Sequence, residues 1–155
     1  MRVLLSLRDS YADTFDNFTK AELTGNTYFL SPPPDLYLNR MKPEDAQHNE
    51  YLLDIPTNEL PYLIRKRIDA YIEHYDNDDW IITARSVYPA ILIVCSDAKI
   101  EDSMQRYIKK SLEDAGIDGE LFYYTTTIKA LLASDKHNNA IWSKELGEDG
   151  DTQSF

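Results

Sequence analysis

The sequence predicts an α/β protein with a central sheet flanked by helices, and three observations support this class. An unbroken apolar segment at 90–95 (AILIVC) is typical of a strand that is covered on both faces. It lies between two segments whose apolar residues recur every three or four positions, 59–75 and 96–116, as in amphipathic helices. Crossovers of this length between successive strands imply parallel pairing in the second half of the chain.

The first half of the chain predicts one helix and several short strands. We expect a short strand at 3–7 and a helix at 11–23, where aromatic residues, alanine and leucine follow a loosely helical spacing. Three consecutive proline residues at 32–34 force extended backbone before the next strand. A polar segment at 41–49 is longer than a tight hairpin turn and predicts a surface loop. The three strands expected in this region are 27–30, 36–39 and 51–55.

The second half predicts longer elements. The helix at 59–75 has Asn58 as its expected N-cap and Pro61 in its first turn, where proline is tolerated. After the buried strand, Ser96 or Asp97 caps a second helix that Gly116 ends. Three shorter elements complete the predicted fold. They are a strand at 121–124, a helix that ends at Ala133, and an edge strand at 141–146. Thr126 or Thr127 is the expected cap of this helix. The apolar stripe of the second helix is Ile100, Met104, Ile108 and Leu112.

Composition indicates one folded domain at 1–146 followed by a disordered acidic tail at 147–155. No segment approaches the roughly 20 apolar residues of a membrane span, and no secretory signal is recognisable, so we expect a cytoplasmic protein. The single cysteine, Cys95, excludes an internal disulfide, and its place in the apolar strand predicts a buried, inert thiol.

The net charge of −11 argues against nonspecific binding along nucleic acid, which requires a high local density of cations. Residues 41–80 hold four Lys or Arg against ten Asp or Glu. Any contact with DNA would have to use a local basic patch, and Arg65, Lys66 and Arg67 form the densest one. The alternative interpretation of this triplet is a solvated helix face.

Several common chemistries have no support in the sequence. The chain lacks a Gly-x-Gly-x-x-Gly segment, a phosphate-binding loop and a nucleophile elbow. The three histidines are far apart and lack the spacing of metal ligands. His48 falls in the expected loop and His74 on the polar side of the first long helix, so both are expected to face solvent.

Two aspartates are the strongest candidates for a functional site. Asp35 begins one expected strand and Asp54 ends the next among apolar neighbours, where a charge is costly unless it is paired or binds a metal. Two carboxylates at neighbouring strand ends can hold Mg²⁺, which activates water and neutralises charge on a phosphoryl group. Alternatively, Asp54 starts a turn and helps to cap the following helix.

Four segments carry a family resemblance: 34–38 (PDLYL), 51–57 (YLLDIPT), 64–71 (IRKRIDAY) and 88–94 (YPAILIV). In this order and spacing they resemble the replication-relaxation family of plasmids and integrative elements, over about residues 20–133. The resemblance implies a restriction-endonuclease-like, PD-(D/E)xK domain with an αβββαβ core and a mixed central sheet flanked by helices. Members often carry a winged-helix segment ahead of this domain, and 155 residues are too few for both.

The resemblance also implies roles for individual residues. Asp35 and Asp54 match the two acids of the nuclease motif and would bind Mg²⁺, and Glu22 loosely matches an upstream helix acid. Pro56 stands where the motif has its lysine, and proline cannot orient or activate water. Lys66, on the following helix, is the candidate for a lysine that has moved from the strand to the helix and reaches back to the acids. Without such a cation, catalysis loses transition-state stabilisation.

Three functional hypotheses follow. The first is a mobile-element protein for DNA processing or replication, with a catalytically degenerate nuclease-like fold and with DNA or other mobile-element proteins as partners. The second is an active Mg²⁺-dependent DNA nuclease. The third is a small α/β module that binds a protein through tyrosines, which are enriched at interfaces, although core packing explains most of the 11 tyrosines. The sequence leaves the oligomeric state and the DNA target open.

Overall fold

A computed structural model of the chain describes residues 12–42, 48–56, 58–78, 80, 84, 86–133, 142–144 and 152–153. These residues form a mixed α/β structure, which confirms the predicted class. In chain order the elements are β1 (Phe15–Thr19), α2 (Lys20–Leu23), β2 (Leu36–Arg40), β3 (Glu50–Asp54), α3 (Pro61–Asp76), β4 (Ala90–Cys95), α5 (Ala98–Ala115), β5 (Tyr123–Thr127), α6 (Ile128–Ala133), β6 (Trp142–Lys144) and β7 (Thr152–Gln153).

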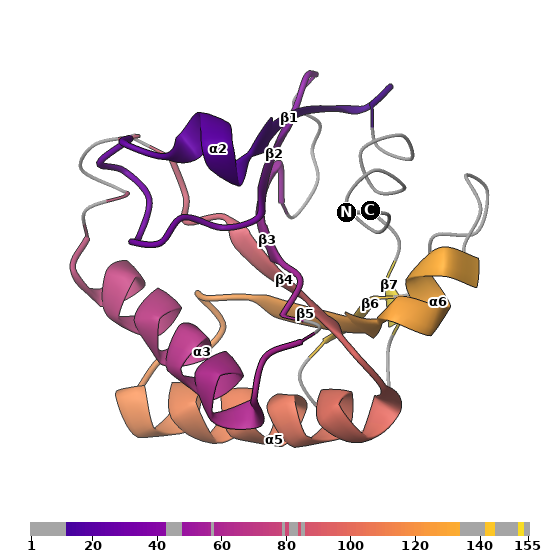
Figure 1. Ribbon diagram of the computed structural model, residues 1–155. Coiled ribbons are helices and arrows are strands. Elements are labelled where there is room, and N and C mark those ends of the chain that lie inside the picture. The colour runs from indigo at the N-terminus through magenta and orange to yellow at the C-terminus, as the bar shows by residue number, and fades with distance from the viewer. Residues whose placement is uncertain are drawn as a thin grey trace.

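The strands form one mixed sheet in which the spatial order follows the chain order (Figure 1). Strands β1, β2 and β3 pair antiparallel, whereas β3, β4 and β5 pair parallel. The short strands β6 and β7 extend the edge beside β5 with antiparallel pairing. Helix α3 connects β3 to β4 and α5 connects β4 to β5, so the parallel pairing predicted for this region is confirmed.

Strand β4 lies at the centre of the core and is buried on both faces, as its unbroken apolar sequence predicts. Ile91, Ile93 and Cys95 pack in the cluster that α3 and α5 cover, and the two helices lie on the same side of the sheet in Figure 1. The intervening residues of β4 belong to a second cluster on the opposite face, which includes Leu131 of α6. The core therefore has two layers, one on each side of the sheet.

Helix α3 begins at Pro61 and buries Ile64, Ile68 and Tyr71 on one face. The predicted cap was wrong: the N-cap is Leu60, whose side chain makes no capping hydrogen bond, and Asn58 lies outside the helix. Proline supplies the start instead, because its fixed φ angle suits the first helical position and its missing N–H would have had no helical partner.

Helix α5 has the predicted ends. The Asp97 carboxylate accepts a hydrogen bond from the Ile100 backbone N–H at 3.0 Å, and this bond lowers the pKa of Asp97. Gly116 ends the helix with φ = 70°, in the left-handed region. The buried stripe of α5 includes Met104, Ile108 and Leu112.

Substitution Gly116→Ala is expected to lower the free energy of unfolding by about 1 kcal/mol, because a Cβ atom disfavours positive φ. Apart from the glycine and its two chain neighbours, no heavy atom of the described residues lies within 4 Å of the position that this Cβ would take, so the cost is confined to the backbone. Urea unfolding followed by circular dichroism measures it. Gly116→Asn is the control and should lose less, since asparagine tolerates this conformation; equal losses would contradict the explanation.

Two predictions for the first half were wrong. The segment expected as a helix at 11–23 contains β1, and only α2 is helical. Pairing with β2 and burial of Phe15 against Tyr51, at 5.7 Å between ring centroids, stabilise the strand. The strand expected at 27–30 is a turn region, where the Asn26 side chain accepts a hydrogen bond from the Tyr28 backbone N–H.

The remaining predictions are confirmed in part. Strand β5 begins two residues later than expected, and the Thr127 hydroxyl accepts a hydrogen bond from the Ala130 backbone N–H as the predicted cap of α6. The strand expected at 3–7 lies outside the described residues. Within the expected tail, the structure describes only 152–153, which pair with β6, and the expected disorder of 147–155 stays a prediction. Among the helices that the structure describes, none is long and apolar enough to cross a membrane.

Candidate functional site

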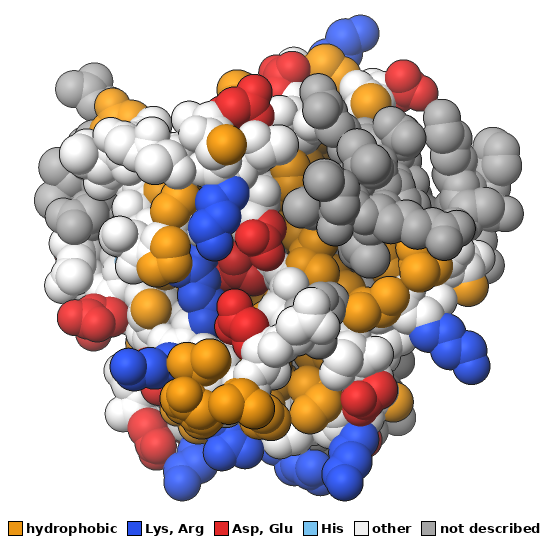
Figure 2. Space-filling view, in the orientation of Figure 1, with side chains coloured by type: hydrophobic (Ala, Val, Ile, Leu, Met, Phe, Trp, Pro, Cys, Tyr) orange, Lys and Arg blue, Asp and Glu red, His pale blue; other side chains and the backbone are white. Residues whose placement is uncertain are grey.

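A pocket of about 590 Å³ lies where β2 begins, β3 ends and α3 starts. Figure 2 shows the face with this pocket, where acidic side chains lie directly against a row of basic ones. This edge is at the carboxyl end of β3, and the carboxyl ends of strands are where α/β sheets bind ligands. The residues that line it are Lys20, Ser31, Pro32, Asp35, Asp54, Pro56, Glu59, Leu63, Lys66, Arg67, Asp69, Ala70 and Glu73.

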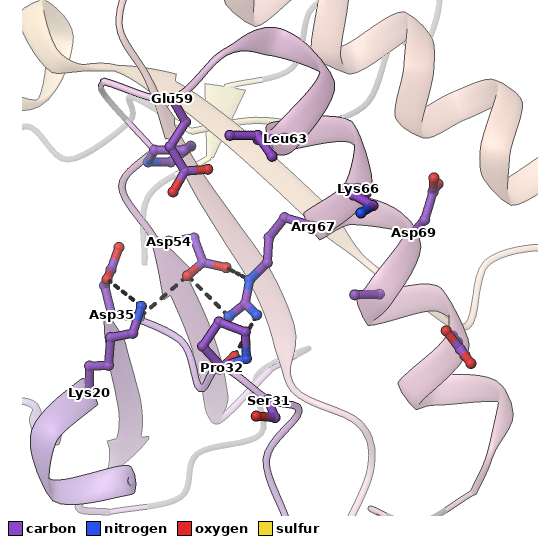
Figure 3. Close-up of a pocket in the computed structure, with 13 residues that line it drawn as sticks. Lys20, Ser31, Pro32, Asp35, Asp54, Glu59, Leu63, Lys66, Arg67 and Asp69 are labelled. Carbon is purple, nitrogen blue, oxygen red and sulfur yellow. Dashed lines mark hydrogen bonds and ion pairs between the residues drawn. The ribbon is translucent and has the colours of Figure 1, made fainter.

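The two predicted aspartates meet in this pocket (Figure 3). Because β2 and β3 are antiparallel and Leu36 pairs with Leu53, the residue before β2 lies beside the last residue of β3. The Asp35 carboxylate accepts a hydrogen bond from the Ile55 backbone N–H at 2.8 Å. The backbone N–H of Asp35 lies 3.4 Å from Oδ1 of Asp54. The backbone of each strand end thus fixes the acid of the other.

Asp54 is held by two side chains of α3. The Arg67 guanidinium donates from Nε to Oδ2 of Asp54 at 2.7 Å and from Nη2 to Oδ1 at 3.3 Å. The Tyr71 hydroxyl donates to the same Oδ2 at 2.5 Å. Arg67 also donates to the backbone carbonyl of Pro32 at 2.5 Å, which ties the loop before β2 to the helix.

This ion pair is almost entirely removed from water. The Asp54 side chain is 9% exposed and the Arg67 side chain 14% exposed. Burial alone would lower the pKa of Arg67, but Tyr71 and Asp54 raise it above its ordinary value. The pKa of the Tyr71 phenol is also raised well above its usual value, first by burial and then by the negative charge of Asp54. Tyr71 therefore stays protonated and donates to the carboxylate.

Substitution Tyr71→Phe is expected to lower the free energy of unfolding by about 1.5–3 kcal/mol, because it removes a buried hydrogen bond to a charged group. Tyr123→Phe is the matched control. The Tyr123 hydroxyl donates a hydrogen bond to the neutral backbone carbonyl of Ile68 at 2.9 Å, and the loss of this bond should lower the free energy of unfolding by about 0.5–1.5 kcal/mol. Chemical unfolding of both variants measures the difference, and a larger loss in Tyr123→Phe would contradict the charge-assisted bond.

Asp35 has a weaker cationic partner. Nζ of Lys20, the first residue of α2, lies 3.8 Å from Oδ1 of Asp35, and the two side chains are 48% and 27% exposed. Solvent screens such a pair and it contributes little to stability. Sequence reasoning missed Lys20, because its approach depends on the turn from β1 into α2.

The basic triplet does not form one patch. Arg65 stacks on the Tyr107 ring of α5 at 5.4 Å from the ring centroid, and Arg67 binds Asp54. Lys66 lines the pocket but makes no ion pair with any residue that the structure describes. The cation that contacts the second acid is therefore Arg67, one position after the residue that the sequence analysis chose.

Glu22 is not among the described residues that line the pocket. Its carboxylate accepts hydrogen bonds from the Thr19 backbone N–H and hydroxyl, both at 2.7 Å, in the capping box of α2. Pro56 lines the pocket at the position of the expected lysine and contributes no charge there.

The pocket does not fit a divalent metal as its side chains are arranged. Within the described ranges, no group of three or more His, Cys, Asp or Glu residues could hold a metal ion. Both oxygen atoms of Asp54 already face donors from Arg67 or Tyr71. Mg²⁺ could use Asp35 and Asp54 together only if Arg67 withdrew, so the expected metal site remains a prediction.

The described histidines and the cysteine lie outside the pocket. His48 was expected to face solvent, but it is buried, and its Nε2 lies 3.1 Å from the Tyr124 hydroxyl. His74 contacts the Tyr88 hydroxyl and the backbone carbonyl of Tyr28 with its two ring nitrogens. Cys95 is buried as predicted, and burial raises the pKa of its thiol to about 12.

Comparisons of the chain with protein-family models, with curated proteins and with solved structures find no match. The resemblance to the replication-relaxation family therefore stays a prediction.

Proposed function

We propose that this protein is a DNA-processing or replication accessory factor of a mobile element, with a nuclease-like domain that has lost catalysis. The observation that carries the proposal is the convergence of Asp35 and Asp54 in one pocket at the adjoining ends of β2 and β3. From β1 to β4 the element order is β-α-β-β-α-β, with three strands ahead of α3, as in the core that the family resemblance implies. Fold analogy alone does not establish chemistry, so the proposal depends on these residues.

Two features support the loss of catalysis. The Arg67 guanidinium binds Asp54 from the side where a metal would need its oxygen atoms. Pro56 replaces the lysine that a nuclease of this kind uses to orient or activate water, and Lys66 does not contact either acid. Under this proposal the acid pair is a remnant whose present role is structural.

An active Mg²⁺-dependent nuclease is the second candidate. Its support is that the pocket contains four further charged side chains for which no ion pair with a described residue is found: Glu59, Lys66, Asp69 and Glu73. If Arg67 released Asp54 on DNA binding, five carboxylates and two lysines would line one cavity. This candidate requires a rearrangement that the first does not.

Incubation with supercoiled plasmid and either Mg²⁺ or Mn²⁺ separates the two candidates. The accessory factor without catalysis predicts no nicking with either metal. The active nuclease would replace it if nicking occurs, is abolished in Asp35→Asn and is retained in the control Asp102→Asn, which changes an exposed acid on α5. Asp35 is the better probe because its partner Lys20 is exposed, whereas Asp54→Asn would leave Arg67 buried without its anion.

Fluorescence anisotropy with a labelled duplex tests DNA binding itself. Lys66→Gln and Lys20→Gln are expected to weaken binding and to reduce its salt dependence, while Lys129→Gln, exposed on α6, should change neither. No binding at low salt would overturn both candidates. It would favour the protein-binding module instead, for which the exposed side chains of Leu60, Tyr62 and Leu63 at the start of α3 offer a surface.

A further inference from the structure

A second cavity, of about 620 Å³, lies at the other end of the parallel strands. Tyr75 belongs to the last turn of α3, Tyr88 lies two residues before β4, and Phe122 directly precedes β5. The first pocket lies instead at the carboxyl end of β3, so the two cavities share no lining residue. The second cavity is lined by Tyr75, Ser86, Val87, Tyr88, Gly119, Glu120 and Phe122.

Three of the seven described residues that line this cavity are aromatic. The rings of Tyr75 and Tyr88 pack edge to face, with centroids 5.5 Å apart and planes at 86°, and Phe122 adds a third ring. Tyr88 is anchored by its own contacts with His74 and Trp80. At the mouth, the Val87 side chain is 77% exposed. Packed aromatic rings and one exposed apolar side chain therefore line the same cavity.

The described residues at the cavity carry a negative charge. The Glu120 carboxylate accepts a hydrogen bond from the Tyr75 hydroxyl at 2.7 Å through Oε2. The pKa of Tyr75 is raised to about 12, by partial burial first, then by Glu120 and by the nearby acids Asp78 and Asp76. None of the described lining residues is Lys, Arg or His. An anionic ligand would be repelled here.

We propose that this cavity binds a guanidinium group, as in arginine or the arginine side chain of a protein partner. Aromatic faces attract organic cations, and a planar guanidinium can stack on a tyrosine ring while it donates hydrogen bonds to a carboxylate. Glu120 is held at the cavity by Tyr75, so the acid is positioned beside the ring. The compact ammonium group of lysine would use the carboxylate but gain less from the ring.

This site is independent of the proposed DNA function, and either can fail alone. The test is a titration of the ¹⁵N-labelled 155-residue chain with N-acetyl-arginine-N-methylamide, in which the chemical shifts of the backbone amides are followed. The expected result is a saturable change at Val87, Gly119 and Glu120. The citrulline counterpart has the same shape without the charge and should cause no saturable change.

Variants locate the effect. Glu120→Gln and Tyr75→Leu are each expected to weaken binding by about tenfold. Asp102→Asn, an acid at the opposite end of α5, should bind as the wild type does. Equal binding of the citrulline compound, shifts confined to other surfaces, or no saturable change with the arginine compound would overturn the proposal.

The source of the guanidinium is separated by two further probes. Tighter binding of a capped Gly-Arg-Gly peptide than of free arginine indicates a protein partner. Tighter binding of free arginine indicates a small-molecule ligand. Both outcomes uphold the guanidinium site, and the amide spectra of the variants report directly whether each one is folded.

Discussion

Replacement of Arg67 by methionine is expected to lower the free energy of unfolding by about 3–5 kcal/mol. The substitution leaves the Asp54 carboxylate, with its side chain only 9% exposed, without its cationic partner. It also removes the hydrogen bond to the Pro32 carbonyl that ties the preceding loop to α3. Urea unfolding followed by circular dichroism measures the loss, and the expected value is a large part of the stability of a domain of this size.

Lys20→Met is the matched control for Arg67→Met. It removes the cation of the neighbouring pair, whose side chains are far more exposed, and should cost no more than about 1 kcal/mol. The double variant Arg67→Met, Asp54→Leu should recover most of the loss, because replacing a buried pair by apolar residues is often neutral. If Arg67→Met and Lys20→Met lose equal stability, the buried pair does not stabilise this edge of the sheet.

The longest elements of the fold were predictable because their burial pattern is local. In α3 and α5 the buried residues recur with the helical period, and β4 is apolar throughout because both of its faces are covered. The ends of α5 were also predictable, since Asp97 and Gly116 act through contacts within a few residues.

The first strand was not predictable in the same way. The sequence of β1, FDNFT, has little strand preference of its own, and pairing with β2 supplies its hydrogen bonds. The reverse error occurred at 27–30, where Phe29 and Leu30 pack into the core without joining a strand. In both cases, residues distant in sequence make the contacts that determine whether the segment is a strand. Local composition therefore cannot distinguish a strand from a loop that packs into the core.

The candidate site was predictable in its acids but not in its cations. Asp35 and Asp54 flank strands that the sequence defines, so their convergence follows from antiparallel pairing. Arg67 is four residues before the buried Tyr71 and therefore lies on the same face of the helix. This spacing indicates Arg67, and not Lys66, as the cation on that face. Lys20 had no comparable indication, because α2 is only four residues long.

Raising the pH above about 10 is expected to unfold the protein steeply, because buried tyrosines resist ionisation. Tyr71 is 0% exposed and Tyr88 is 4% exposed, and burial is the largest cause that raises the pKa of both phenols above the usual value. The unfolded chain loses these protons near pH 10, whereas the native state keeps them. The contribution of these two phenols to the free energy of unfolding is therefore complete below pH 10. Above pH 10 it falls by about 3 kcal/mol per pH unit, because each of the two groups contributes to the slope.

Urea midpoints measured at a series of pH values from neutral to strongly alkaline test this dependence. Cys95 should begin the decline earlier, because burial raises the pKa of its thiol to about 12 from an unfolded value near 8.5. Tyr88→Phe should reduce the slope above pH 10 by about 1.4 kcal/mol per pH unit, the share of one group. Val87→Ala, an exposed neighbour, should keep the wild-type slope. Stability that stays constant through pH 11 would mean that these phenols ionise as readily in the native state as in the unfolded chain, and that water reaches them.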